Sequence, residues 1–475
     1  MKFHLSFTDG SSSSLSLFAQ VILGITIVAV GFGLAGAGNV YFFILLTFLA
    51  VIPLFFTRYT IHLFIILLIL DVVVQETFSY GGYRVLGFQS GFFDVFILIS
   101  AGILFVRNRE KFTFKLLIPF LVYSAVFLLS VLFHPDVLES GIVNWQKIAV
   151  ENFLILFLAM LLIDSKQDAR TLLHGTIVVM SLIALYFFYR YWQQGHVVFF
   201  GGGGSEEALN YAFPTSSSFR NKSMMAAQIV PVMVILSILT FELRSIMMRI
   251  LCGMGAVITF IVILIGSSRG ALLAVSGGIL FYLIVRFRMG RLPLIPILFI
   301  SLVGGGGALQ TDVGDRMVDR FFTGEAREEL TLNDFNRVSL VKTSAVLIKQ
   351  NPLLGIGFSE LKFFEENKKY NFGGNILAHP HNSYLQMWVF GGTLTVIAFF
   401  WALVHLMSPV MRAVKQKIND PLLIAVAAAI IGLLLDFGTG RILFVPSISH
   451  LFFILLTGVF FYARFLLQDS MTDDP

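Results

Sequence analysis

Two histidines at the end of the longest polar stretch are the first candidates for chemistry. His379 and His381 lie two positions apart, immediately before an apolar run that starts near residue 382. A neutral imidazole can accept a proton in a transition state near neutral pH, so either residue could act as a general base. Pro380 is expected to keep the two side chains apart, so that only one is aimed at a substrate. The alternative is an interfacial histidine bonded to a loop carbonyl, and residue type alone favours neither.

An arginine between two apolar runs is the second candidate. Residues 267–270 read Ser-Ser-Arg-Gly. Ser267 or Ser268 is expected to cap the helix that follows, which places Arg269 in its first turn beside free backbone N–H groups. The positive end of the helix dipole adds to the charge of the side chain, and this combination suits a phosphate group. The alternative is an arginine that extends to lipid headgroups.

The polar stretch at 309–381 contains another arginine. Asn333 or Asp334 is expected to cap a helix that ends before Pro352. On a helical wheel Arg337 falls at the centre of the apolar arc, so we expect it to face the body of the protein. A buried arginine needs an anionic partner. The sequence therefore predicts that Arg269 and Arg337 converge on one anionic site.

Other polar residues fall near the ends of apolar runs. Arg220 and Lys222 precede one run and could hold a second phosphate or a lipid headgroup, although an interfacial anchor is the simpler interpretation. Charges inside membranes tend to pair, so structural salt bridges are expected for a further set: Asp94, Lys147, Asp436 and Arg441. With two neighbouring histidines, no convincing third histidine and a single cysteine, Cys252, we predict no metal site and no cofactor.

Long apolar runs must position these residues. The chain is 57% hydrophobic and 13% charged, whereas typical soluble domains carry about 25% charged residues. The pattern predicts an all-α polytopic membrane bundle of about 12–14 transmembrane helices, and loop lysines and arginines explain the net charge of +5 without nucleic acid. The candidate spans are 15–36, 38–57, 59–75, 89–106, 114–133, 147–163, 172–191, 222–240, 250–267, 269–286, 292–308, 382–407, 421–437 and 446–467.

The distribution of basic residues predicts the orientation of these spans. With the N-terminus in the cytoplasm, almost every short inner loop is basic and the short outer segments hold fewer lysines and arginines. Both termini are then cytoplasmic, and the 309–381 stretch is a large, partly helical outer loop. We expect three parts: an N-terminal transmembrane bundle at 1–308, the loop domain at 309–381 and C-terminal transmembrane helices at 382–475.

The order of these motifs resembles that of the O-antigen ligase and O-antigen polymerase superfamily. Ser-Arg-Gly lies between two spans, and Arg337 precedes Asn-Pro-Leu-Leu-Gly-Ile-Gly at 351–357. His381 opens His-Asn-Ser-Tyr-Leu-Gln, with Gly391 and Gly392 following. The resemblance implies transfer of a glycan from undecaprenyl diphosphate to an acceptor sugar at the periplasmic face of the bacterial inner membrane. Relatives place an acidic residue shortly before the glycine pair, whereas this chain has Trp-Val-Phe at 388–390.

The resemblance also implies residue roles. Arg269 and Arg337 would bind the diphosphate and stabilise the charge that grows on it, and His381 would accept the proton of the acceptor hydroxyl. Additional substrate contacts would come from His379, Arg220 and Lys222. The reaction would be metal-independent and would invert the anomeric centre.

Three functions remain open at this point. A ligase would use lipid A core or a similar glycolipid as acceptor, and a polymerase would use a growing glycan. The third is a non-enzymatic transporter of lipid-linked glycans, although no internal repeat of the kind common in transporters is visible. The ligase is our preferred interpretation. The partners it requires are the undecaprenyl-diphosphate-linked donor, a glycan or glycolipid acceptor and membrane lipids.

Overall fold

The computed structural model describes residues 83–85, 88–90, 101–102, 104–106, 108–111, 113–193, 222–265, 268–290, 327–370, 372, 377–440 and 442–472. The chain divides into two compact units, Met1–Phe64 and Ile65–Pro475, and all described residues belong to the second. The predicted spans at 15–36, 38–57, 59–75 and 292–308 lie outside the described residues, as does Arg220.

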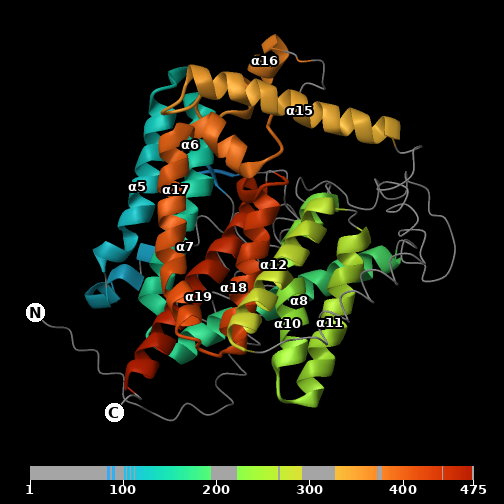
Figure 1. Cartoon of the computed structure of the whole chain (residues 1–475). Helices are drawn as coiled ribbons and strands as arrows, with labels where there is room; N and C mark the ends of the chain where they lie inside the picture. The colour runs from blue at the N-terminus through green and yellow to red at the C-terminus, as the bar shows by residue number, and fades with distance from the viewer. Residues whose placement is uncertain are drawn as a thin grey trace, which may run out of the picture. The chain divides into compact units, whose positions relative to one another are not determined.

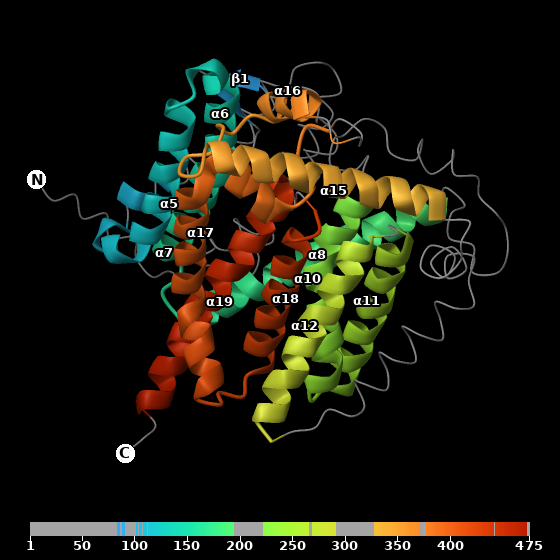
Figure 2. The same ribbon diagram turned by 45° about the horizontal axis from the view of Figure 1, so that its top comes forward.

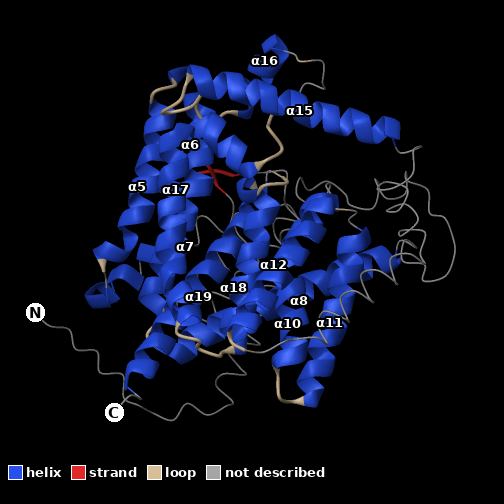
Figure 3. Cartoon of the chain, viewed as in Figure 1, coloured by secondary structure: helices blue, strands red, loops and turns tan. Residues whose placement is uncertain are grey.

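Helices make up most of the described residues (Figures 1 and 3). Eight helical segments of the described part are long and apolar enough to cross a membrane, and the apolar α18 is slightly shorter. The predicted all-α, multi-pass membrane architecture is therefore confirmed. The principal helices are α5 (Phe114–Leu132), α6 (Leu138–Trp145), α7 (Glu151–Leu162), α8 (Lys166–Gln193), α10 (Lys222–Glu242), α11 (Ile246–Ile265), α12 (Arg269–Arg288), α15 (Arg327–Gln350), α16 (Glu360–Tyr370), α17 (Ser383–Lys415), α18 (Pro421–Phe437) and α19 (Pro446–Thr472).

Shorter elements complete the described part. A π-helical turn, η4 (Gln146–Val150), joins α6 to α7, and the 3-10 turns are η2 (Arg109–Lys111), η3 (Pro135–Val137) and η7 (Ile442–Phe444). Strands β1 (Tyr83–Val85) and β2 (Phe88–Ser90) form an antiparallel pair. The predicted span at 89–106 is wrong at its start, because residues 89 and 90 belong to β2. The search for long apolar runs missed this short antiparallel pair.

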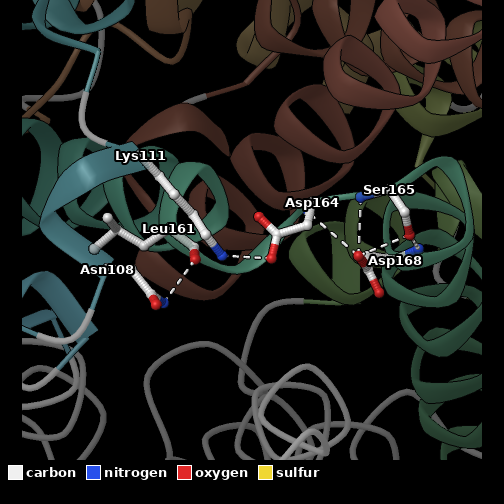
Figure 4. Close-up of polar contacts among 6 residues, drawn as sticks. All are labelled: Asn108, Lys111, Leu161, Asp164, Ser165 and Asp168. Carbon is white, nitrogen blue, oxygen red and sulfur yellow. Dashed lines mark hydrogen bonds and ion pairs between the residues drawn. The ribbon is translucent and has the colours of Figure 1, made fainter. Parts of the chain in front are cut away.

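One end of the bundle carries charged contacts between helix termini. Lys111 pairs with Asp164 (Figure 4). Lys166 pairs with Asp469 at 2.7 Å. The carboxylate of Asp168 accepts hydrogen bonds from the backbone N–H groups of Asp164 (3.1 Å) and Ser165 (2.9 Å), and the Ser165 hydroxyl accepts from the backbone N–H of Asp168 (3.2 Å), so the two residues cap α8 reciprocally. These contacts place the end of α7, the start of α8 and the end of α19 together.

The opposite end carries α15 and α16. Figure 2 shows α15 running across the ends of the other helices rather than along them. Its Thr343 hydroxyl donates to the side-chain oxygen of Asn367 on α16 (3.0 Å), and Gln350 donates to the Tyr370 hydroxyl (2.6 Å). The helix ends before Pro352, as predicted. It begins at Arg327, so the predicted caps at Asn333 and Asp334 are wrong, because both residues lie inside the helix.

Close packing of α12 against α18 fixes the relation between the two helices. A Cβ atom on Gly432 would lie 2.7 Å from the carbonyl oxygen of Ala274, and one on Gly278 would lie 2.8 Å from that of Ala428. Small residues at these positions let the two backbones approach, as is common in membrane helix pairs. The start of α12 is thereby held beside the end of α18.

Candidate active site at the starts of α12 and α17

The turn at Pro352–Phe358 is locked into a kink of α17. Gly392 has a φ of +72° and interrupts the helix, and Figure 1 shows the bend in α17. The backbone N–H of Thr393 donates to the carbonyl oxygen of Pro352 (2.9 Å), and that of Ile356 donates to Val389 (2.9 Å). The turn therefore satisfies backbone groups that the kink leaves without helical partners.

Glycine is required on both sides of this contact. A Cβ atom on Gly392 would lie 2.1 Å from the carbonyl oxygen of Leu353, and one on Gly355 would lie 2.5 Å from the backbone carbonyl of Phe390. Both glycines have positive φ angles, which L side chains rarely adopt. The Gly-Ile-Gly and Gly-Gly motifs thus serve the scaffold that supports the site.

Two further contacts hold the turn. The Ser130 hydroxyl of α5 donates to the carbonyl oxygens of Leu354 (2.5 Å) and Phe390 (3.0 Å). The ring of Phe358 is fully buried and stacks on Phe127 of α5. Three segments far apart in the sequence meet here, so the orientation of the first part of α17 is set by packing on both sides.

The start of α17 is fixed by the segment that follows α18. Asn382 caps the helix by accepting from the backbone N–H of Leu385 (2.9 Å), and its amide donates to the carbonyl oxygen of Gly438 (2.7 Å). The backbone N–H and the hydroxyl of Ser383 both donate to Gly440, at 2.9 and 2.7 Å. His381 therefore precedes a rigidly held helix start, as the sequence predicted.

The two histidines lie against each other. Their ring centroids are 4.3 Å apart and both residues are half-buried. The expectation that Pro380 separates the side chains is wrong, because His381 adopts a left-handed backbone conformation with a φ of +54°, which turns the chain back at this point. Such a conformation is uncommon for a residue other than glycine and is found more often at functional sites.

The start of α12 contacts the same segment. Ser268 caps the helix by accepting from the backbone N–H of Ala271 (3.2 Å), which confirms the predicted cap and puts Arg269 in the first turn. A Cβ atom on Gly270 would lie 2.1 Å from the Thr439 hydroxyl and 2.7 Å from a carboxylate oxygen of Asp436. Because 438–440 also holds Asn382 and Ser383, the helix starts that carry Arg269 and His381 lie at one corner of the bundle. The side chains of Arg269 and Lys222 lie outside what the structure describes.

Arg337 does not face inward. It is exposed, and the prediction that it points into the body of the protein is wrong. The buried face of α15 is built instead from Leu340 and Leu347 together with Ser339, Thr343 and Ser344, while Val338 and Val341 are each 51% exposed. Small hydroxyl side chains can be buried where they find hydrogen-bond partners, as Thr343 does with Asn367. The helical wheel counted them as polar and so placed the buried face about a quarter-turn away.

Asp436 is a residue whose place sequence reasoning missed. It is 1% exposed, and one carboxylate oxygen accepts a hydrogen bond from the Thr439 hydroxyl (2.8 Å). The other oxygen is buried and has no hydrogen-bond partner among the described residues. The predicted salt bridge is therefore replaced by a hydroxyl contact within the described part of the chain. The sequence did contain a signal for a polar turn at this position. An acidic residue near the end of an apolar run is followed shortly by Gly-Thr-Gly at 438–440.

Comparison with protein families covers the centre of the chain. Residues 254–400 match the model of a family described as O-antigen ligase. This match supports the O-antigen ligase family for this part of the chain. No curated protein matches the chain significantly.

The O-antigen ligase domain contains most of the site described above. It includes Arg269, Arg337, both histidines and the kink at Gly392, and it stops before Asp436. Members of this family are glycosyltransferase-like ligases and polymerases of the membrane, and the predicted family resemblance is confirmed. Within the described residues, no group of three or more His, Cys, Asp or Glu side chains is arranged to hold a metal ion.

Proposed function

We propose that this protein is an O-antigen ligase-type glycosyltransferase that moves a glycan from undecaprenyl diphosphate to an acceptor sugar such as that of lipid A core. The observation that carries the proposal is the corner where α12 and α17 begin. It combines a capped helix start bearing Arg269 with a fixed helix start preceded by His381. An anionic leaving group and a hydroxyl nucleophile need these two kinds of group close together.

The proposed reaction is a direct displacement. The acceptor oxygen bonds to the anomeric carbon while the bond from that carbon to the diphosphate oxygen breaks. The diphosphate leaves with the bonding electron pair, and His381 takes the hydroxyl proton. Arg269 and the first N–H groups of α12 stabilise the leaving charge, and the anomeric centre is inverted. Arg269 and the positive start of α12 balance the diphosphate in this proposal, so no divalent metal is part of the step.

Arg337 enters this proposal as a surface contact. Its exposed position on α15 supports a contact with a lipid-linked diphosphate that arrives from the membrane surface. His379, Arg220 and Lys222 are proposed as additional substrate contacts. A polymerase that uses the same donor and a growing glycan as acceptor is the second candidate, because the same corner supports the same bond exchange.

A transfer assay with purified protein tests the proposal. The protein is reconstituted with an undecaprenyl-diphosphate-linked glycan and offered either lipid A core or a second lipid-linked glycan. We expect transfer to lipid A core. Transfer only to the second lipid-linked glycan would identify a polymerase, and donor binding without either product would favour a transporter. Arg269→Lys should impair transfer, because the point charge of lysine does not reproduce the bidentate fork of arginine. Lys349→Ala, at an exposed position of α15, is the control.

We also propose the orientation and domain division expected from the sequence: a bacterial inner-membrane protein with cytoplasmic termini and parts at 1–308, 309–381 and 382–475. The single cysteine, Cys252, is buried, so introduced cysteines can be labelled selectively. A cysteine at the exposed Lys368 should react with an impermeant reagent in cells with an opened outer membrane, and one at the exposed Lys415 should not. Labelling at position 415 alone would reverse the orientation.

A further inference from the structure

Asp436 stands between the two helix starts of the candidate site. On one side, its carboxylate oxygen and Thr439 leave no room for a side chain at Gly270, the residue after Arg269. On the other side, the turn it begins presents the carbonyl oxygens of Gly438 and Gly440 to the helix start after His381. A single short segment, Asp436 to Gly440, is therefore in contact with both halves of the site.

Both the backbone and the side chain of Asp436 contact that segment, and the Thr439 hydroxyl lies within hydrogen-bond distance of each, 3.0 Å from the carbonyl oxygen and 2.8 Å from the carboxylate. The Thr439 hydroxyl donates to the side chain of Asp436 at 2.8 Å, and the backbone N–H groups of Thr439 and Gly440 donate to its carbonyl oxygen at 2.8 and 3.2 Å. These bonds close a tight turn directly after α18. The turn aims its carbonyl oxygens at Asn382 and Ser383, so the side chain of Asp436 helps to set where α17 begins.

Stability does not explain an aspartate at this position. Its second carboxylate oxygen is buried without a hydrogen-bond partner among the described residues, and a buried polar atom of this kind is costly. Even a buried ion pair can often be replaced by apolar residues of similar volume with no loss of stability, and Asp436 has no charged partner among the described residues to offset its burial. A leucine has the same number and branching of side-chain heavy atoms as the aspartate and would avoid the cost of the unpaired carboxylate oxygen.

We infer that Asp436 is a positioning residue of the transfer site, which sets the spacing between the start of α12 and the start of α17. The inference rests on the proposed function. It assigns Asp436 to the site although the residue lies beyond the O-antigen ligase domain match at 254–400. The role is carried by the carboxylate, which holds the Thr439 side chain in the turn and lies against Gly270 at the start of α12. Asp436 itself touches neither substrate.

Asp436→Leu and Asp436→Asn test the inference, with Asp420→Leu as a matched control. Asp420 lies at the other end of α18, where it caps the helix through Leu423 (2.9 Å) and accepts from the Tyr462 hydroxyl (2.9 Å). We expect Asp436→Leu to keep or raise the midpoint of thermal unfolding while turnover falls about 10- to 100-fold, the size of effect a small misplacement causes. Asp420→Leu should lower the midpoint and leave turnover per folded molecule unchanged. Asp436→Asn, which keeps an oxygen for Thr439, should remain within about threefold of wild type.

Three results would overturn the inference. Unchanged turnover in Asp436→Leu would remove any positioning role. A joint fall of thermal stability and turnover would show an ordinary structural role. Equal damage in Asp436→Asn and Asp436→Leu would show that the carboxylate acts through its charge. Absence of transfer by wild-type protein is a different outcome, because it would reject the proposed function itself and this inference with it.

Discussion

The two ends of the bundle use polar residues in different ways. At the end where α10 and α12 finish, Arg286 is 1% exposed and forms an ion pair with Glu242. Its Nε donates to the same carboxylate (2.7 Å), the Tyr282 hydroxyl donates there too (2.6 Å), and a further guanidinium nitrogen donates to Asn419. This cluster, called the Arg286 cluster below, connects the ends of α10 and α12 to the start of α18 and so stabilises the fold.

The opposite end is held mainly by backbone carbonyl oxygens and by glycine. Asn382 and Ser383 bond to carbonyl oxygens, one carboxylate oxygen of Asp436 has no partner in the described part, and His381 adopts a left-handed conformation. Incomplete satisfaction and backbone strain are tolerated where they serve a function. The comparison teaches that the Arg286 end maintains the fold, whereas the His381 end trades some stability for the arrangement of a site.

The largest expected effect comes from Gly392→Ala. The new Cβ atom would lie 2.1 Å from a backbone oxygen that cannot move without breaking the contact between the Pro352 turn and α17, so we expect no folded protein. Gly290→Ala is the matched control, since Gly290 has a similar φ of +74° but open space around a Cβ atom. The measurement is the yield of monodisperse protein after size-exclusion chromatography in detergent. Normal yield of Gly392→Ala would show that the turn is not locked.

A smaller loss of stability is expected from breaking the ion pair in the Arg286 cluster. Glu242→Gln should lower the free energy of unfolding by about 3–5 kcal/mol, because it leaves a buried guanidinium without its counter-charge. Replacing both partners with apolar residues of similar size should recover most of that loss. Thermal unfolding in detergent measures both variants, and the single variant should keep normal turnover per folded molecule. A selective loss of turnover would contradict the division of roles between the two ends.

The smallest effect on stability is expected from the exposed ion pairs at the end of the bundle that carries Arg286. The side chains of Lys111 and Asp164 are 39% and 54% exposed, so Lys111→Ala should change the free energy of unfolding by less than about 1 kcal/mol. Lys166→Ala, which breaks the similarly exposed pair with Asp469, should behave alike. A change in either variant as large as that of Glu242→Gln would show that burial does not decide which charged contacts maintain the fold.

Local sequence signals predicted the local features of the fold. Long apolar runs gave the spans, Ser268 gave the cap of α12, and Pro352 gave the end of α15, because each depends on neighbouring residues alone. The face of α15 that carries Arg337 could not be predicted this way. Which face of α15 is buried depends on hydroxyl side chains such as Thr343, which bonds to Asn367 of α16. The sequence does not reveal these partners, because they meet only when the loop is folded.

The candidate site shows the same limit. Arg269 and His381 were chosen by residue type, position and family resemblance, and each lies at a helix start as predicted. The contact between these helix starts is made by Asp436 and Thr439, more than fifty positions after His381 in the sequence. Only the packing of α18 against α12 brings that segment to the site, and no periodicity or motif encodes it.

Turnover of His381→Ala in the reconstituted transfer assay, with donor binding measured on the same preparations, tests the central claim most directly. The account predicts that His381→Ala folds normally, binds the lipid-linked donor like wild type and loses about 10²–10⁴-fold in turnover, the usual contribution of a positioned base. His379→Ala, whose ring lies against that of His381, is the matched variant and should lose less. Full activity in His381→Ala, or a greater loss in His379→Ala, would contradict the assignment of His381 as the base.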